Sequence, residues 1–189
     1  MTKALIIIDM INADVPKRAD KNELIKNQLK LIRAFQKRKY PVILTGGTIE
    51  CDFNPVTHRL YGDEYAGKND DPKQAAKEES YDIDIIEELQ NTKPDKIIRK
   101  CEYSAFYNTE LDQYCKNKKI SDLYFCGISS GCCVYFTAVD ALYRKIQPNL
   151  ITDASGSDNE KKHKQNAENF NSLIGPVLKT EQLLENLER

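Results

Sequence analysis

The sequence has few of the features that mark membrane-embedded or secreted proteins. Its apolar runs, of which Leu5–Ile8 is typical, are far shorter than the roughly 20 residues that a membrane-spanning helix needs. The N-terminal segment also lacks the longer apolar stretch and the small-residue cleavage site of a signal peptide. We therefore expect a cytoplasmic protein with no membrane partner.

Neither sign of charge dominates, and metal-ligand patterns are missing. The chain has 28 Lys and Arg against 29 Asp and Glu, so it offers no electrostatic reason to bind nucleic acid, and we expect none as a partner. His58 and His163 lie far apart, and the six cysteines form no C-x-x-C pair, so the spacing of zinc ligands is absent. We predict no metal, no other cofactor, and mostly free thiols in a reducing compartment.

Apolar runs alternate with amphipathic segments along the whole chain. The predicted strands are 5–8, 40–47, 95–100, 122–127 and 148–154. The predicted helices are 20–35, 80–89, 108–119, 131–144, 159–170 and the tail 179–188. This order predicts an α/β protein with a parallel sheet covered on both faces, in one domain over residues 1–189. Residues 46–80 lack periodicity, and we predict a long loop there that shapes the binding pocket.

Three reactive residues follow three of the predicted strands. Asp9, Lys100 and Cys133 would all lie at the carboxyl edge of a parallel sheet, where ligands bind in such folds. Taken singly, Asp9 could be a turn or helix-cap residue, Lys100 an exposed charge and Cys133 a small core residue. Together they form a set in which the acid takes a thiol proton and the ammonium stabilises the negative charge.

Cys133 stands near the start of the predicted helix 131–144. The positive end of that helix should favour a thiolate, and its unpaired N–H groups could hold a developing oxyanion. Small neighbours, Ser129 to Gly131, leave room for a substrate carbonyl. The adjacent Cys132 leaves open which of the two thiols reacts.

Four segments of the chain carry a family resemblance. "ALIIIDMINADV", "IIRKCEYSAFYNTEL", "CGISSGCCVYFTAVDAL" and "LITDASGSDNEKKH" resemble, in order, motifs of the isochorismatase-like cysteine hydrolases. The resemblance implies a Rossmann-like three-layer α/β/α sandwich with a mostly parallel sheet of about six strands. It also implies a catalytic triad of Asp9, Lys100 and Cys133, with Cys132 in a structural position.

The same resemblance implies an oxyanion hole and a reaction. It implies a cis peptide between Ile128 and Ser129, which turns the Ser129 N–H to join that of Cys133. The expected activity is hydrolysis of a C–N bond in a small amide or carbamoyl substrate through a thioester. Two alternatives stay open: vinyl ether hydrolysis of the isochorismatase type, and a non-catalytic binding protein of the same fold.

Pocket residues, metal content and assembly complete these expectations. Tyr103, Phe106 and Tyr135 are candidate pocket residues, with core packing as the alternative. The nicotinamidase branch of the family holds a metal with several histidines after the second strand, where this chain has only His58; His163 should be structural. We expect a homo-oligomer, a dimer or larger, for which the tail offers a stripe of Leu183, Leu184 and Leu187.

Overall fold

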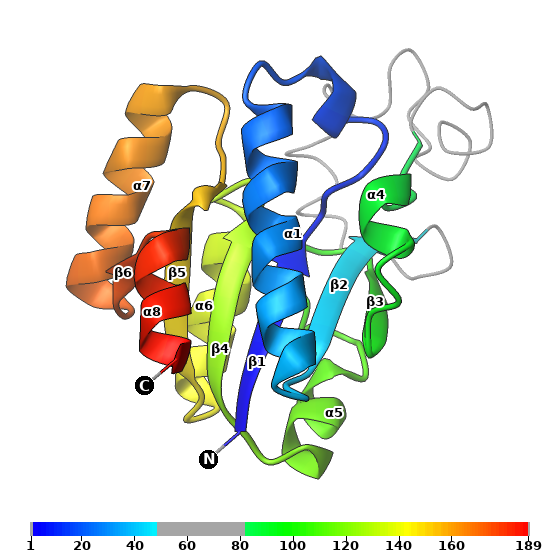
Figure 1. Ribbon diagram of the computed structural model, residues 1–189, viewed down its shortest axis with the longest axis vertical. Coiled ribbons are helices and arrows are strands. Elements are labelled where there is room, and N and C mark those ends of the chain that lie inside the picture. The colour runs from blue at the N-terminus through cyan, green and yellow to red at the C-terminus, as the bar shows by residue number, and fades with distance from the viewer. Residues whose placement is uncertain (1, 49–81, 189) are drawn as a thin grey trace.

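The computed structural model describes residues 2–48 and 82–188, and its centre is a six-stranded sheet (Figure 1). The strands are β1 (Thr2–Ile8), β2 (Val42–Gly47), β3 (Lys96–Lys100), β4 (Ile120–Gly127), β5 (Gln147–Ser155) and β6 (Val177–Leu178). They lie in the order β3-β2-β1-β4-β5-β6, and every neighbouring pair is parallel. All carboxyl ends therefore meet at one edge, as the sequence predicts.

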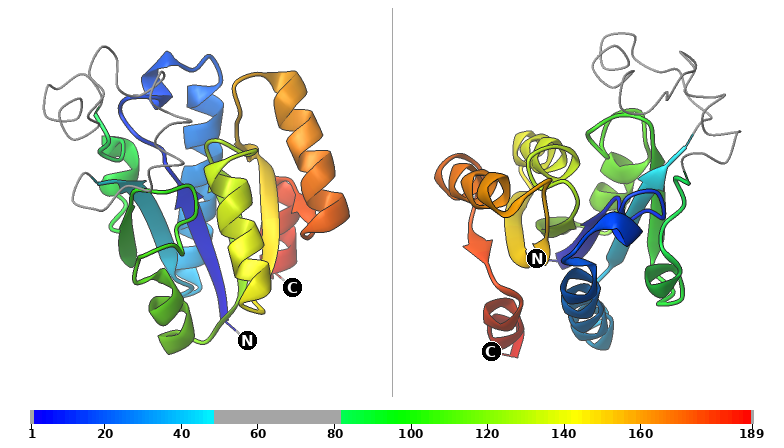
Figure 2. Two further views of the ribbon diagram at one scale, coloured as in Figure 1. Left: turned by 180° about the vertical axis from the view of Figure 1, so that it is seen from behind. Right: turned by 90° about the horizontal axis from the view of Figure 1, so that it is seen from above.

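Helices cover both faces of the sheet (Figure 2). They are η1 (Val15–Lys17), α1 (Lys21–Lys37), α4 (Glu87–Gln90), α5 (Leu111–Asn117), α6 (Cys133–Tyr143), α7 (Glu160–Leu173) and α8 (Thr180–Glu188). Residues of α1, α4 and α8 share one core cluster, whereas residues of α5, α6 and α7 share another. The protein is thus a three-layer α/β/α sandwich. Among the described residues, none of the helices is long and apolar enough to cross a membrane.

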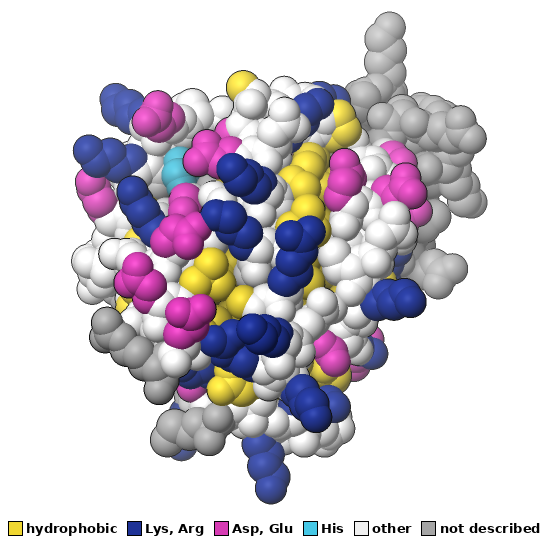
Figure 3. All heavy atoms as spheres, in the orientation of Figure 1, with side chains coloured by type: hydrophobic (Ala, Val, Ile, Leu, Met, Phe, Trp, Pro, Cys, Tyr) yellow, Lys and Arg dark blue, Asp and Glu magenta, His cyan; other side chains and the backbone are white. Residues whose placement is uncertain are grey.

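The side chains of β1 point alternately to the two faces of the sheet, and this explains why its sequence is apolar without a break. Leu5 and Ile7 point into the cluster under α1, and Ala4, Ile6 and Ile8 point into the cluster under α6. A strand that is buried on both faces needs apolar residues at every position, and such strands are typical of parallel sheets. On the outer face that carries α1 and α8, cationic and anionic side chains are interspersed (Figure 3).

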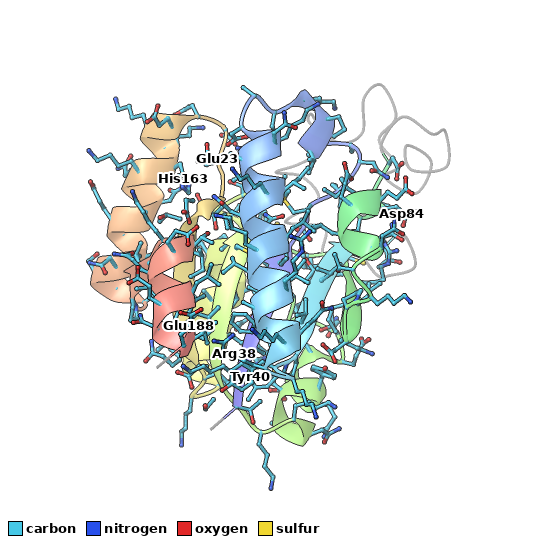
Figure 4. All side chains as sticks on the ribbon, viewed as in Figure 1. Glu23, Arg38, Tyr40, Asp84, His163 and Glu188 are labelled. Atoms are coloured by element: carbon cyan, nitrogen blue, oxygen red, sulfur yellow. The ribbon has the colours of Figure 1, made fainter. Side chains whose placement is uncertain are left out.

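The C-terminal helix α8 packs on the body of its own chain. Leu183 and Leu187 are 0% and 8% exposed and belong to the same core cluster as α1. Lys30 forms an ion pair of 2.5 Å with Glu181, and Arg38, labelled in Figure 4, donates from Nε to the Leu187 carbonyl. The leucine stripe that we expected to offer an oligomer interface is therefore already covered. The homo-oligomer itself stays a prediction.

Two helices begin later than the sequence predicts. The segment before α4 is extended, because Ile85 forms an antiparallel bridge with Ile11 and the Asp82 and Asp84 carbonyls accept N–H bonds from the same loop. The helix predicted from residue 80 is therefore wrong over residues 82–86, and residues 80 and 81 lie outside the described part of the chain. The helix predicted from Asn108 begins only at Leu111.

Candidate active site

The ends of β1 and β3 bring Asp9 and Lys100 into direct contact. Lys100 Nζ lies 2.6 Å from Asp9 Oδ2, and the two side chains are only 6% and 15% exposed. The Thr45 hydroxyl, from the end of β2, donates to Asp9 Oδ1 over 2.6 Å, and the Asp9 N–H donates back to Thr45 Oγ1 over 3.1 Å. Both carboxylate oxygens therefore have a partner, as a nearly buried acid requires. Lys100 is not the exposed charge of the alternative interpretation.

Lys100 remains an ammonium although it is buried. Burial by itself lowers its pKa, but the nearby charges of Asp9 and Cys133, with hydrogen bonds to both, raise the pKa above the ordinary value for lysine. The Nζ also donates to the Glu102 carbonyl over 3.0 Å. The site thus holds a fixed positive charge between a carboxylate and a sulfur atom.

Cys133 is the first residue of α6, and Cys132 is the cap before it. The hydrogen bond with Cys132, together with burial, raises the pKa of Cys133, and the Lys100 charge opposes this only in part. The same bond lowers the pKa of Cys132. The resting Cys133 thiol therefore needs a base to take its proton, and the contribution of the helix start to its thiolate stays a prediction.

The loop from β4 to α6 leaves the Ser129 amide without a hydrogen-bond acceptor among the described residues. Gly127 has φ of 109° and its Cα faces the backbone of Ile8 so closely that a Cβ would collide with it. The Ile128–Ser129 peptide is cis, as the resemblance implies. The Cys133 N–H differs from that of Ser129, because it lies within hydrogen-bond reach of the Cys132 sulfur. These are the donors that we predicted for the oxyanion hole.

Of the three predicted pocket residues, Tyr103 shows the closest link to the thiols. Burial and the charges of Cys132 and Cys133 raise its pKa, and its ring stacks on Phe136 at 5.1 Å between centroids. Tyr135 makes an edge contact with the same Phe136 ring at 6.3 Å.

Phe106 is placed differently. It is 4% exposed and belongs to the core under α6, with the Arg144 guanidinium over its ring at 4.6 Å. The packing alternative fits Phe106 better than a place in the pocket.

Sequence reasoning missed Thr45, and it gave His163 only an undefined structural role. Thr45 stands near the end of a strand at the same sheet edge, so the topology could have identified it. His163 on α7 (Figure 4) lies with Nδ1 2.9 Å from Ser130 Oγ and with Nε2 3.1 Å from the Thr152 carbonyl. His163 is the last residue of the quoted segment "LITDASGSDNEKKH", but its contact with Ser130 joins segments that are distant in sequence, so the segment alone could not predict it.

Residues 2–48 and 82–188 contain cysteines in two states. There, Cys115, Cys126, Cys132 and Cys133 have free thiols, whereas Cys101 is disulfide-bonded. The same residues contain no cluster of three or more His, Cys, Asp or Glu side chains that could hold a metal ion. His58 and most of the predicted loop 46–80 lie outside them.

Residues 3–182 match the family model of the isochorismatase domain. The chain belongs to the isochorismatase family. Over 104 residues it is 32% identical to the phenazine biosynthesis protein PhzD1 of Pseudomonas aeruginosa, an alignment of 55% of this chain and 50% of that protein. Over 74 residues it is 35% identical to the ureidoacrylate amidohydrolase RutB of Acinetobacter baylyi, which covers 39% of this chain and 30% of that protein. The chain thus spans half or less of these two relatives.

Solved structures of the family share the fold over almost the whole chain. The N-carbamoylsarcosine amidase from Thermoplasma acidophilum superposes with a TM-score of 0.75 at 25% identity. The superposition covers 95% of this chain and 97% of the amidase. The fold is therefore shared over almost the whole chain, and the names of these two relatives are those of an amidase and an amidohydrolase.

Proposed function

We propose that the protein is a cysteine hydrolase that cleaves a C–N bond of a small amide or carbamoyl compound. The observation that carries the proposal is the arrangement at the sheet edge. A nearly buried Asp9–Lys100 pair stands beside Cys133, which begins a helix and follows the unpaired amide of Ser129 in the same loop. An acid, a cation, a thiol and oxyanion donors are the parts that thiol acyl transfer requires.

The proposed first half-reaction forms a thioester. Asp9 takes the proton of Cys133 as the sulfur attacks the substrate carbonyl, and the oxygen becomes an anion held by the N–H groups of Ser129 and Cys133. Asp9 then gives the proton to the nitrogen as the C–N bond breaks, and the amine or ammonia leaves. Lys100 pairs with the Asp9 carboxylate before attack and stabilises the negative charge while it moves to sulfur.

The second half-reaction releases the product. Asp9 removes a proton from a water molecule, whose oxygen attacks the thioester carbonyl in the same oxyanion hole. The C–S bond breaks, and the proton returns to the Cys133 sulfur. One water is consumed for each C–N bond cleaved, and the enzyme returns to its starting state.

The names of two relatives support this chemistry over the alternatives. N-carbamoylsarcosine amidase and ureidoacrylate amidohydrolase are both named for amide-type cleavage. The thiol points the same way, because vinyl ether hydrolysis needs an acid and a cation but no sulfur nucleophile. The complete set of groups also favours an enzyme over a binding protein.

A substrate screen tests the proposal. The purified protein should be incubated with a panel of primary amides, ureas and N-carbamoyl compounds, and ammonia release should be measured beside a Cys133→Ala control. We expect release from at least one compound, and none from the variant. Turnover of isochorismate that survives in Cys133→Ala would instead establish the vinyl ether alternative.

A further inference from the structure

We propose that Asn166, on α7, is a positioning residue that holds the oxyanion-forming loop in place through Ser130 and Ser157. The inference rests on the proposed function, because it concerns the same oxyanion hole. None of the motifs quoted from the sequence includes this asparagine. Asn166 contacts the loop between β4 and α6, although its own helix α7 comes only after β5 in the chain.

For a neutral His163, the directions of its two hydrogen bonds follow from the Thr152 carbonyl. The Thr152 carbonyl can only accept, so the His163 Nε2 that lies 3.1 Å from it carries the ring proton in the neutral tautomer. The Nδ1 atom is then an acceptor, and the Ser130 hydroxyl donates to it over 2.9 Å. The lone pairs of Ser130 Oγ are left to accept from another donor.

Asn166 is that donor. Its Nδ2 atom lies 3.2 Å from Ser130 Oγ and 3.3 Å from Ser157 Oγ, so each of its two protons has one acceptor. The contact is possible because residue 131 is glycine: a Cβ there would collide with the Asn166 amide. Asn166 therefore joins the nucleophile loop to the loop after β5.

Both serines act on Ser129, which supplies one of the oxyanion donors. Ser157 Oγ lies 3.2 Å from Ser129 Oγ, and Ser130, which is 0% exposed, donates its N–H to the Gly156 carbonyl over 2.7 Å. The Ser129 carbonyl accepts from the N–H of Cys132 and that of Val134. The peptide that follows Ser129 is thus held at its carbonyl and at the Ser130 N–H, and the Ser129 side chain is held by Ser157. These contacts fix the residue whose N–H is the proposed oxyanion donor.

Two reagents for Cys133 separate this role from a general structural one. 4-Nitrophenyl acetate acetylates a thiolate through a tetrahedral oxyanion and releases 4-nitrophenolate. Iodoacetamide alkylates the same thiolate by direct displacement of iodide, with no oxyanion. Because both reactions need the thiolate, the ratio of their rate constants cancels any change in thiol ionisation and reports the oxyanion hole alone.

The variants are Asn166→Ala and Asn166→Asp, of which the second keeps the shape and loses both donated protons. Asn169→Ala on the exposed side of the same helix is the matched control. We expect the Asn166 variants to lower the acetylation-to-alkylation ratio at Cys133 at least tenfold, and the control to leave it within twofold. Rates at Cys133 are read by peptide mass spectrometry, and folding is checked by circular dichroism.

Ser157→Ala provides a milder variant if the Asn166 variants do not fold, and we expect it to lower the ratio at least threefold. An unchanged ratio in folded variants would overturn the positioning role and leave the proposed function intact. If Cys133 of the wild-type protein reacts with neither reagent, the proposed nucleophile itself is wrong. The two failures are therefore distinguishable.

Discussion

Cysteine side chains lie in two contrasting environments in this protein, the core and the active site. Cys115 and Cys126 are 1% and 0% exposed in the core, and burial raises the pKa of Cys115 to about 12 and that of Cys126 further. Cys132 and Cys133 are partly exposed at the start of α6, near Lys100. The core thiols behave as small apolar groups, whereas the two site thiols form a hydrogen bond with each other and lie near the Lys100 ammonium.

The difference does not lie in thiol acidity alone. The pKa of Cys133 is raised as well, first by its bond with Cys132 and then by burial. The charges near Cys115, those of Asp112 and Arg144, pair with each other, and that thiol is only 1% exposed. Cys133 instead has access at the sheet edge, beside the Asp9–Lys100 pair. A reactive cysteine in this fold is therefore defined by its neighbours at the sheet edge.

The largest effect should come from removing one site thiol. We expect Cys133→Ala to lower turnover by at least about a thousandfold, because no other group can form the thioester. Cys132→Ala should keep most of the activity, since its thiol only hydrogen-bonds the nucleophile. Steady-state kinetics on the substrate found by the screen measure both. The opposite ranking of the two variants would make Cys132 the nucleophile.

The next largest effect concerns the ion pair. Asp9→Asn should lower turnover by about a hundredfold or more, because it removes the general base. Lys100→Met should act similarly by leaving the carboxylate and thiolate without a cation. Lys96→Met, at the half-buried start of the same strand and away from the site, is the matched control and should stay near the wild-type rate.

Stability separates the catalytic role of this pair from its structural one. Removing one partner leaves a nearly buried charge alone, which costs about 3–5 kcal/mol of unfolding free energy in comparable pairs. The double variant Asp9→Asn/Lys100→Met should regain much of that loss in urea unfolding and still lack activity. Recovery of turnover together with stability would show that the pair only supports the fold.

Alkylation compares the two thiol environments directly. In the native protein, iodoacetamide should modify Cys133 or Cys132 at least about a hundredfold faster than Cys115 and Cys126, because core thiols are both un-ionised and inaccessible. In urea, all four should react at similar rates. Peptide mapping after timed quenching gives the rates. Fast native modification of Cys126 would remove the contrast.

How much the sequence could predict depends on the range of the interactions. The Asp9, Lys100 and Cys133 positions follow from short patterns, because each stands just after an apolar strand and a parallel sheet gathers such ends at one edge. Thr45 is not recognised from the sequence, because "LTGG" is typical of a strand that runs into a turn. Asn166 could not be found, since its role depends on how α7 packs against a loop more than 30 residues earlier.

One helix was wrongly predicted for a physical reason. Ile83, Ile86 and Leu89 have helical spacing, so the sequence favours a helix from residue 80. In the fold, Ile85 instead bridges Ile11, and Ile83 and Ile85 pack over the two glycines that end β2. Tertiary contacts of an edge segment outweighed a weak local preference.

The smallest expected effect is the pH dependence of stability that the core thiols cause. In the unfolded chain, Cys115 ionises near its ordinary pKa of 9.0, whereas the folded protein keeps the proton until about pH 12. Between these values the unfolded state binds fewer protons, so the free energy of unfolding falls as pH rises, by up to about 1.4 kcal/mol per pH unit for one such group. Below pH 9 the contribution is constant.

Cys115→Ala should flatten this slope, although it lowers stability at every pH by leaving a small cavity. Cys132→Ala should not flatten it, because the folded state lowers the pKa of that thiol. Urea unfolding of the three proteins at pH 8, 10 and 11, followed by circular dichroism because the chain has no tryptophan, gives the slopes. Comparing each variant with the wild type cancels the titration of tyrosines and lysines. Equal slopes for wild type and Cys115→Ala would mean that the Cys115 thiol ionises as easily in the core as in water, and the contrast between core and site would then rest on access alone.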